Sequence, residues 1–208
     1  MKWLGNAGFM IRGNGMVIYI DPCNIAGNVA EDEMADLLFI THEHFGHCDP
    51  ESIRMVRKSD CTTLIPENMS LQFRGDARRV MAGDSLTGDL SIKGVDIEVL
   101  ATYMSCEGVR SPGAGVGYLF TLGGSKIYHA GHTCAIPDVG LHSPDIVLIP
   151  IGGHMTMDEA QAADAVSSIS PGAVIPMGYD SDEDGMSAAR EFMSIMEERS
   201  PATRVVIL

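Results

Sequence analysis

The amino-acid sequence predicts an α/β fold in which helices pack outside layered sheets. Short apolar runs typical of strands dominate the first half of the chain, and amphipathic helical segments alternate with strands in the second half. The chain has 208 residues and no low-complexity or linker-like stretch, so we expect a single domain over residues 1–208. A composition of 45% hydrophobic and 20% charged residues is typical of a globular chain and not of a disordered one.

The first half contains two segments that we interpret as strands buried on both faces. Met16–Ile20 is an apolar, β-branched run that ends at Asp21-Pro22, and Leu37–Thr41 is a second such run. A histidine-rich loop follows the second strand. Asp49 then supplies an N-cap and Pro50 occupies the first helical position, which predicts a helix directly after the loop.

The second half is predicted to alternate strands with helices. Gly123-Gly124 indicates a hairpin turn, and Thr156 with Glu159 forms a capping box that begins a helix. Another amphipathic helix is predicted over Ser187–Arg199. The predicted strands of this half are Ile92–Tyr103, Gly117–Leu122, Lys126–His129, Asp145–Ile151, Ala173–Met177 and Arg204–Leu208.

Composition also limits location and partners. With 14 Lys and Arg against 28 Asp and Glu, the net charge of −14 repels nucleic acids and anionic membranes, so neither is an expected partner. No apolar run reaches the roughly 20 residues of a spanning helix, and the N-terminus lacks the apolar core of a signal peptide. We therefore expect a cytoplasmic protein. The absence of a CxxC pair is typical of reduced thiols, and the cysteines are Cys23, Cys48, Cys61, Cys106 and Cys134.

The histidine-rich loop carries the clearest chemical signal in the sequence. His42, His44 and His47 fall within six positions at the end of a predicted buried strand. Neutral imidazole is a common ligand of zinc, copper, nickel and iron, and a tight loop can direct several imidazoles into one cleft. The loop therefore predicts a metal site.

Six landmarks occur in order along the chain: Trp3–Phe9, Tyr19–Pro22, Thr41–His47, Tyr128–Thr133, Pro150–Asp158 and Ile175–Tyr179. Together they resemble the metallo-β-lactamase fold and, within it, metal-dependent hydrolases related to L-ascorbate-6-phosphate lactonase. This resemblance covers nearly the whole chain and implies an αββα sandwich of two mixed sheets with outer helices and a metal cleft along one sheet edge.

The sequence departs from the family pattern at four positions that concern metal binding. Gly46 replaces the aspartate of HxHxDH, and His132 replaces the aspartate of HAGDT that usually bridges two metals. Gly178 replaces the histidine of PMHY, and Asn6 replaces the histidine of LGHA. Because donors and a bridging anion are lost, we expect no more than one ion per chain.

The remaining imidazoles suit a single divalent ion without a carboxylate ligand. We expect zinc, with copper or nickel as alternatives, and the predicted ligands are His42, His44, His47 and His132. Hydrolysis is expected to be slow, because Gly46 removes the loop acid and only Glu43 and Asp49 offer a nearby carboxylate.

Secondary candidates surround this set. Met104, Cys106 and Cys134 are possible sulfur ligands, and the resemblance implies that Asp21 orients the loop histidines. Gly152-Gly153, before a predicted helix, suggests a place for an anionic substrate. The resemblance implies that His129 and His154 support the cleft without binding metal, and His142 is predicted to lie in a surface loop.

Three functions fit the sequence. The first is a hydrolase of the metallo-β-lactamase superfamily with a rearranged, at most mononuclear site, acting weakly on a small anionic or lactone-like substrate. The second is a non-hydrolytic metal-binding protein, copper- or redox-linked. The third is a pseudoenzyme that acts by protein association. Metal content separates the first two from the third, and a homo-oligomer is compatible with each.

Overall fold

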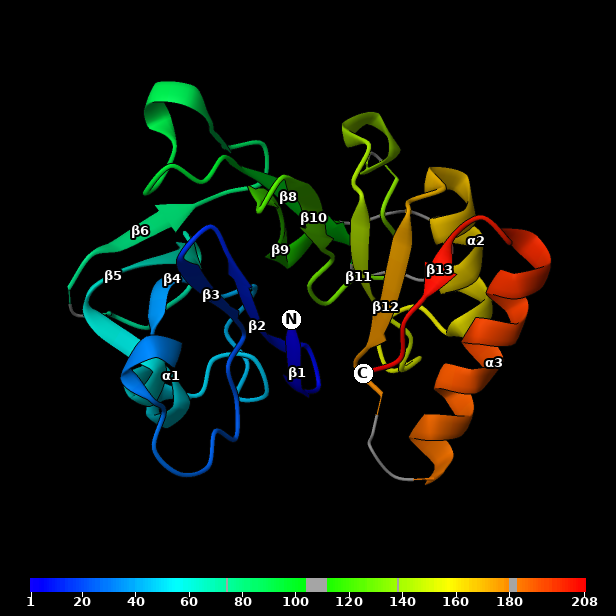
Figure 1. Ribbon diagram of the computed structural model, residues 1–208, viewed down its shortest axis with the longest axis horizontal. Helices are drawn as coiled ribbons and strands as arrows, with labels where there is room; N and C mark the ends of the chain where they lie inside the picture. Colours follow the sequence, from blue (N-terminus) through cyan, green and yellow to red (C-terminus); the bar gives the residue numbers. More distant parts are fainter. Residues whose placement is uncertain (74, 104–111, 138, 180–182) are drawn as a thin grey trace.

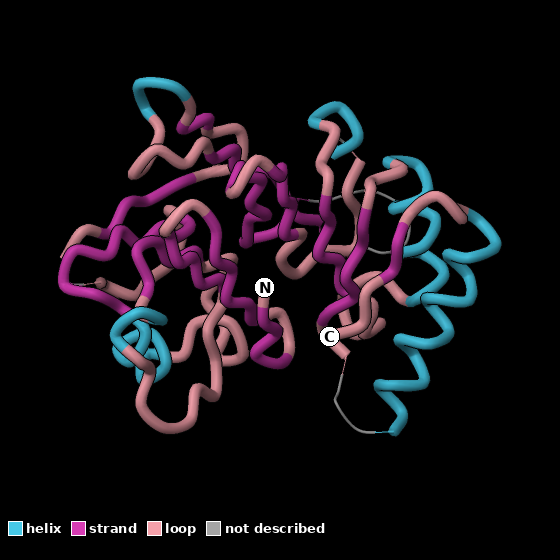
Figure 2. The backbone as a smooth tube through the Cα atoms, viewed as in Figure 1, coloured by secondary structure: helices cyan, strands magenta, loops and turns pink. Residues whose placement is uncertain are grey.

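Two mixed β-sheets pack face to face between outer helices in the computed structural model, which describes residues 1–208 except 74, 104–111, 138 and 180–182. Helix α1 (Pro50–Val56) covers the outside of the first sheet. Helices α2 (Glu159–Ile169) and α3 (Glu183–Arg199) cover the outside of the second (Figures 1 and 2). This arrangement confirms the αββα sandwich that the resemblance implied.

The first sheet has six strands in the order β1-β2-β3-β4-β5-β6. Strands β1 to β3 are antiparallel, and β3 to β6 are parallel. Its strands are β1 (Lys2–Gly5), β2 (Gly8–Gly13), β3 (Met16–Ile20), β4 (Ala35–Phe39), β5 (Arg57–Pro66) and β6 (Ala77–Val80), with a 3-10 turn η1 (Glu31–Glu33) before β4.

The second sheet has seven strands in the order β13-β12-β11-β10-β9-β8-β7. Strands β7 to β10 are antiparallel, and β10 to β13 are parallel. Its strands are β7 (Ser85–Leu86), β8 (Ile97–Tyr103), β9 (Pro112–Leu122), β10 (Ser125–His129), β11 (Ile146–Pro150), β12 (Ala173–Met177) and β13 (Arg204–Val205), with 3-10 turns η2 (Gly88–Leu90) and η3 (Val139–His142).

Aromatic packing between the sheets fixes the end of β4. The rings of Phe39 and Tyr118 stack with centroids 4.9 Å apart, and Phe120 contacts Phe39 edge-on. The Tyr118 hydroxyl donates a hydrogen bond to the Ile40 carbonyl at 2.8 Å. Because Ile40 directly precedes the histidine-rich loop, this buried contact anchors the point from which the loop leaves the sheet.

Most predicted elements appear in the structure. Strand β3, the β9–β10 hairpin and β12 are confirmed, and Asp49 caps α1 with Pro50 at its first position. The predicted strands at residues 37–41 and 145–151 shift to β4 and β11 by one or two residues. The described part of the chain contains no helix long and apolar enough to cross a membrane.

Other boundaries were wrong. The cap of α2 is Asp158, which accepts a hydrogen bond from the Gln161 amide at 2.8 Å, so the capping box lies two residues beyond Thr156 and Glu159. Helix α3 begins four residues before Ser187. The strand predicted from Ile92 begins at residue 97, since Ile92 makes only an isolated bridge with Val95. The last strand ends at residue 205 and does not reach Leu208.

Candidate metal centre

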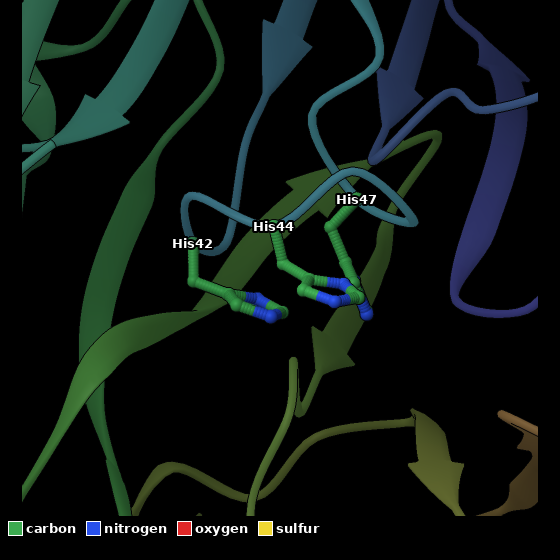
Figure 3. Close-up of side chains that lie close together, drawn as sticks. All are labelled: His42, His44 and His47. Atoms are coloured by element: carbon green, nitrogen blue, oxygen red, sulfur yellow. The ribbon is translucent and has the colours of Figure 1, made fainter. Parts of the chain in front are cut away.

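The loop between β4 and α1 brings its three histidines together. One ligand atom from each of His42, His44 and His47 lies within 4.8 Å of the other two. Figure 3 shows the three side chains projecting toward the same side of the loop. The turn is closed by the His44 carbonyl, which accepts hydrogen bonds from the His47 and Cys48 amides at 2.9 and 2.8 Å. The spacing in the sequence therefore becomes a compact group of nitrogen donors.

Asp21 orients this group through hydrogen bonds to Thr41 and His47. Its fully buried carboxylate accepts hydrogen bonds from the Thr41 amide at 2.8 Å and the Thr41 hydroxyl at 2.6 Å. It also lies 2.8 Å from His47 Nδ1. Burial raises the pKa of Asp21, but the hydrogen bond and charge of His47 outweigh it and hold the pKa below its usual value. The carboxylate therefore stays ionised and accepts from His47 Nδ1, which leaves Nε2 for a metal, as the resemblance implied.

Thr41 extends the same orientation to His42. The Thr41 oxygen lies 3.0 Å from His42 Nδ1, while its single proton is donated to Asp21. His42 Nδ1 must then carry the proton of this contact, and Nε2 is left with a lone pair. Sequence reasoning missed Thr41, although its place between a buried strand and the first histidine was a signal.

Two histidines of the cleft are held in the neutral form that metals bind. Burial, with a contribution from neighbouring His47, lowers the pKa of His42 to about 3. Burial and the nearby His47 and His44 also lower the pKa of His132. At neutral pH both imidazoles are uncharged, so a metal ion does not need to displace a proton from either of them.

His132 lies beside the compact group and not within it. It follows β10, and its ring centroid is 5.4 Å from that of His42 and 6.0 Å from that of His47. All four histidines line one cleft of about 430 Å³. Four imidazoles on one cleft fit a single zinc, copper or nickel ion by donor chemistry. The structure brings His42, His44 and His47 together with His132 beside them, and the role of all four as metal ligands stays a prediction.

The positions that lost donors contact one another on one side of the cleft. Asn6 Nδ2 donates to the Gly46 carbonyl at 3.0 Å and lies 3.3 Å from His47 Nε2. The Gly178 amide donates to the Asn6 carbonyl at 3.0 Å. A Cβ at Gly46 would lie 3.0 Å from Asn6 Nδ2, and Gly178 has φ +69°, which other residues rarely adopt. An amide network therefore occupies the side where the family pattern has further ligands.

The two nearby carboxylates are engaged elsewhere. Glu43 accepts hydrogen bonds from the Ser70 amide and hydroxyl, both at 2.5 Å. Asp49 caps α1 and accepts from the Ser52 hydroxyl at 2.5 Å. Glu43 is the only acid among the described residues that line the cleft. Neither group is placed as a free general base.

The remaining histidines have separate roles. His129 is buried, with Nε2 2.9 Å from the Ala7 carbonyl and Nδ1 accepting from the Gly131 amide at 3.1 Å, so both ring nitrogens serve the backbone. His154 is exposed at the rim of the cleft. His142 pairs with Glu98 at 2.8 Å and lies outside the lining of the cleft.

Of the sulfur candidates, only Cys134 lies among the described residues, and it offers no thiolate ligand. Cys134 is disulfide-bonded, which corrects the expectation of a reduced thiol there, whereas Cys23, Cys48 and Cys61 are free and buried. A disulfide sulfur has no thiolate to bind a metal. Met104 and Cys106 lie outside the described residues.

The suggested anion site at Gly152-Gly153 finds no support in the local hydrogen bonds. The Gly153 amide donates to the Met157 carbonyl at 3.2 Å, and α2 begins six residues later with its first turn capped by Asp158. No Lys or Arg is present among the described residues that line the cleft. The described side chains there supply histidine nitrogens but no fixed positive charge.

Comparisons with known proteins identify the family of the chain. Residues 1–178 match the family model for the beta-lactamase superfamily domain, so the chain belongs to that family. It is 33% identical to a UPF0173 metal-dependent hydrolase of Thermococcus kodakarensis, over the whole chain and 95% of that protein. The solved structure of Igni18, a metallo hydrolase from Ignicoccus hospitalis, is similar with a TM-score of 0.79 at 25% identity, covering 100% of this chain and 93% of that one.

A second solved structure is similar over almost the same extent. It is described as a proposed metal-dependent hydrolase from Parabacteroides distasonis, with a TM-score of 0.77 and 27% identity over 99% of this chain and 90% of that one. These relatives support the metallo-β-lactamase resemblance. The narrower relation to ascorbate-6-phosphate lactonase stays a prediction.

Proposed function

We propose that this protein is a metal-dependent hydrolase that binds one divalent ion and turns over its substrate slowly. Zinc is the expected ion. His42, His44, His47 and His132 would hold the ion. The observation that carries the proposal is the compact group of three loop histidines, whose ligand atoms lie within 4.8 Å of one another. Relatives that are named metal-dependent hydrolases over the full length of the chain support the reaction class.

When bound, such an ion polarises a carbonyl and lowers the pKa of a bound water. The chain contributes the orientation of its ligands, because Asp21 fixes His47 and Thr41 fixes His42. The described residues that line the cleft contribute no free carboxylate to accept a proton, since Glu43 is held by Ser70. A positioned base is worth roughly 10²–10⁴-fold in rate, so turnover should fall short by a factor of that order.

The cleft favours a neutral, lactone-like substrate over an anionic one. Its described lining holds no Lys or Arg, and small or apolar residues form much of the wall, including Ala7, Ala114, Pro150 and Met155. The net charge of −14 opposes the approach of anions. A small cyclic ester meets these conditions, because its carbonyl can approach the histidines without a charged group to neutralise.

We further propose a cytoplasmic location without nucleic-acid or membrane partners. The net charge of −14 opposes nucleic-acid and anionic-membrane partners. Three free, buried thiols support the cytoplasmic location, whereas the disulfide at Cys134 does not. A homo-oligomer is compatible with this proposal.

The second candidate is a non-hydrolytic copper- or redox-linked binding protein. It is favoured by a donor set made only of imidazoles, together with the lack of an available acid in the described lining. A pseudoenzyme that acts by protein association is the third candidate, and it predicts no retained metal.

Elemental analysis of protein purified without added metal separates these functions. We expect close to one zinc per chain and slow hydrolysis of a neutral δ-lactone that a chelator stops and zinc restores. Retained copper without hydrolysis would favour the second candidate, and a metal-free, inactive protein the third. Two ions per chain after exhaustive dialysis, or fast turnover that survives chelation, would contradict the proposal.

A further inference from the structure

A second cleft lies on the outer side of the first sheet, beside α1. Its volume is about 440 Å³, and it is lined by Cys48, Pro50, Ile53, Arg54, Arg57, Lys58, Ser59, Leu71, Gln72, Phe73 and Gly75. None of the four histidines of the metal centre lines it. Nothing in the proposed function uses this cleft.

Positive charge gathers there in a strongly acidic protein. Arg54, Arg57 and Lys58 line the cleft, and no Asp or Glu is present among its described lining residues. The whole chain has 14 Lys and Arg against 28 Asp and Glu. A cluster of three cations without an acid in the same wall is therefore contrary to the overall charge of the molecule.

Two of these cations lack a counter-ion. Lys58 Nζ is paired with Asp36 at 2.6 Å, whereas Arg54 and Arg57 form no ion pair with any described residue. Arg57 Nε is buried and has no hydrogen-bond acceptor in the described structure. A buried donor without an acceptor is costly, so this nitrogen would gain from an oxygen that enters the cleft.

The rest of the lining is apolar. Leu71 is 37% exposed and Phe73 is half-buried, and both lie on the chain between β5 and β6. Ile53 of α1 and Pro50 complete this surface. A ligand that contacts the whole cleft needs one anionic end for the arginines and one apolar body for these side chains.

We propose that this cleft binds a small organic anion with a phosphate or carboxylate head and an aliphatic or aromatic body. The head lies between Arg54 and Arg57, because guanidinium groups bind these oxyanions through paired hydrogen bonds. The body packs on Leu71 and Phe73. The site is independent of the metal centre and stands whether or not the protein is a hydrolase.

Calorimetric titration of the full-length protein with hexyl phosphate, and separately with hexanoate, tests the site. Inorganic phosphate and 1-hexanol are titrated as the two halves of the probe. We expect saturable binding of one anion per chain, at least tenfold tighter than either half alone. Equal binding of hexanol would overturn the proposal by showing an apolar groove only, and equal binding of inorganic phosphate by showing a simple ion site.

Variants locate the binding. Arg57→Gln and Arg54→Gln are each expected to weaken hexyl phosphate at least tenfold. Leu71→Glu should do the same by placing a carboxylate in the wall, and because Leu71 is exposed, this substitution should not unfold the protein.

Arg78→Gln is the matched control, since Arg78 is exposed, pairs with Asp76 and lies outside the cleft. His132→Ala should bind like the parent protein, which excludes phosphate held by a metal in the other cleft. Unchanged affinity in all three cleft variants would overturn the proposal.

Discussion

The metal cleft and the second cleft are almost equal in size and opposite in chemistry. Their volumes are about 430 and 440 Å³. Among the described residues, five histidines and no Lys or Arg line the first, whereas two arginines, a lysine and no acid line the second. The two clefts adjoin the same short segment, because His47 lines the metal cleft and the next residue, Cys48, lines the second cleft. Concavity alone therefore says little about what each binds, and the side chains decide it.

The two clefts also differ in how their polar groups are satisfied. At the metal cleft, Asp21 and Thr41 engage Nδ1 of His47 and His42, so Nε2 of each ring carries the lone pair in a defined tautomer. At the second cleft, Arg57 Nε has no hydrogen-bond acceptor among the residues that the structure describes. The first is organised before a ligand arrives, and the second is completed by one.

Loss of one imidazole is the largest change that we expect. His42→Ala and His132→Ala should each remove a ligand outright. The affinity for zinc should therefore fall by more than the roughly 10–100-fold that is typical of losing an orienting partner. Retained metal after dialysis, measured by elemental analysis, provides the readout. His142→Ala serves as the control and should keep the ion, since His142 pairs with Glu98 outside the cleft. Full zinc content in His132→Ala would remove His132 from the ligand set.

Restoring the family's ligands should make the metal cleft more similar to the two-metal site of the family, but we expect three changes to be insufficient for a second ion. Gly46→Asp with His132→Asp and Gly178→His leaves Asn6 in place, whose Nδ2 lies 3.0 Å from a Cβ at position 46. Histidine at position 178 also adopts a left-handed backbone that costs about 1–2 kcal/mol. We expect the triple variant to take up less than one additional zinc per chain.

Adding Asn6→His to these three changes should allow two ions, which sit roughly 3.5–4 Å apart in two-metal sites. Lactone hydrolysis should then rise toward the roughly 10²–10⁴-fold that a positioned base supplies. Zinc stoichiometry and initial rate are measured on the same preparations. If the triple variant already bound two ions tightly, the amide network around Asn6 would not be what excludes the second.

Asp21→Asn should have an intermediate effect by disturbing orientation without removing a ligand. The amide keeps one acceptor for Thr41 but loses the charge that fixes the Nδ1 proton of His47. We expect zinc affinity to fall about 10–100-fold. Competition with a chromogenic chelator measures it, and hexyl phosphate binding at the second cleft should be unchanged. Loss of both zinc binding and hexyl phosphate binding would indicate general unfolding.

Local signals predicted the parts of these sites that come from one stretch of chain. The three loop histidines and the Asp49 cap lie within a few residues, so spacing and capping rules were sufficient for them. The hydrogen bonds from Ser70 to Glu43 join residues 27 positions apart, and no pattern in either segment indicates them. The availability of a base could therefore be judged only from the fold.

Contacts between distant segments also explain what the sequence did not predict about the second cleft and the first sheet. Arg54, Arg57 and Lys58 resemble an ordinary solvated face until the segment carrying Leu71 and Phe73 folds beside them. Strand β5 begins at Arg57, directly after α1 ends at Val56, so no turn residue marks the change. The short β1, β6 and β7 depend on pairing with neighbours more than on their own residues.

The smallest expected effect concerns Asp36, which neutralises the charge of Lys58 in the second cleft. Its carboxylate lies 2.6 Å from Lys58 Nζ and accepts from the Val17 amide at 2.8 Å. Burial raises the pKa of Asp36, but the hydrogen bonds from Lys58 and Val17 outweigh it and hold the pKa below its usual value. The stabilisation is therefore present above the unfolded pKa of about 3.9 and is lost as pH falls through the lower folded value.

Asp36→Asn should cost about 1 kcal/mol in free energy of unfolding at pH 7, measured by urea denaturation, with the difference shrinking below about pH 3.9. The same variant should bind hexyl phosphate about twofold to fivefold more tightly, because Lys58 is no longer neutralised at a partly exposed site. A stability difference that does not change with pH would assign the effect to packing. Tighter binding without a change in zinc content would show that the charges of one cleft act without reaching the other.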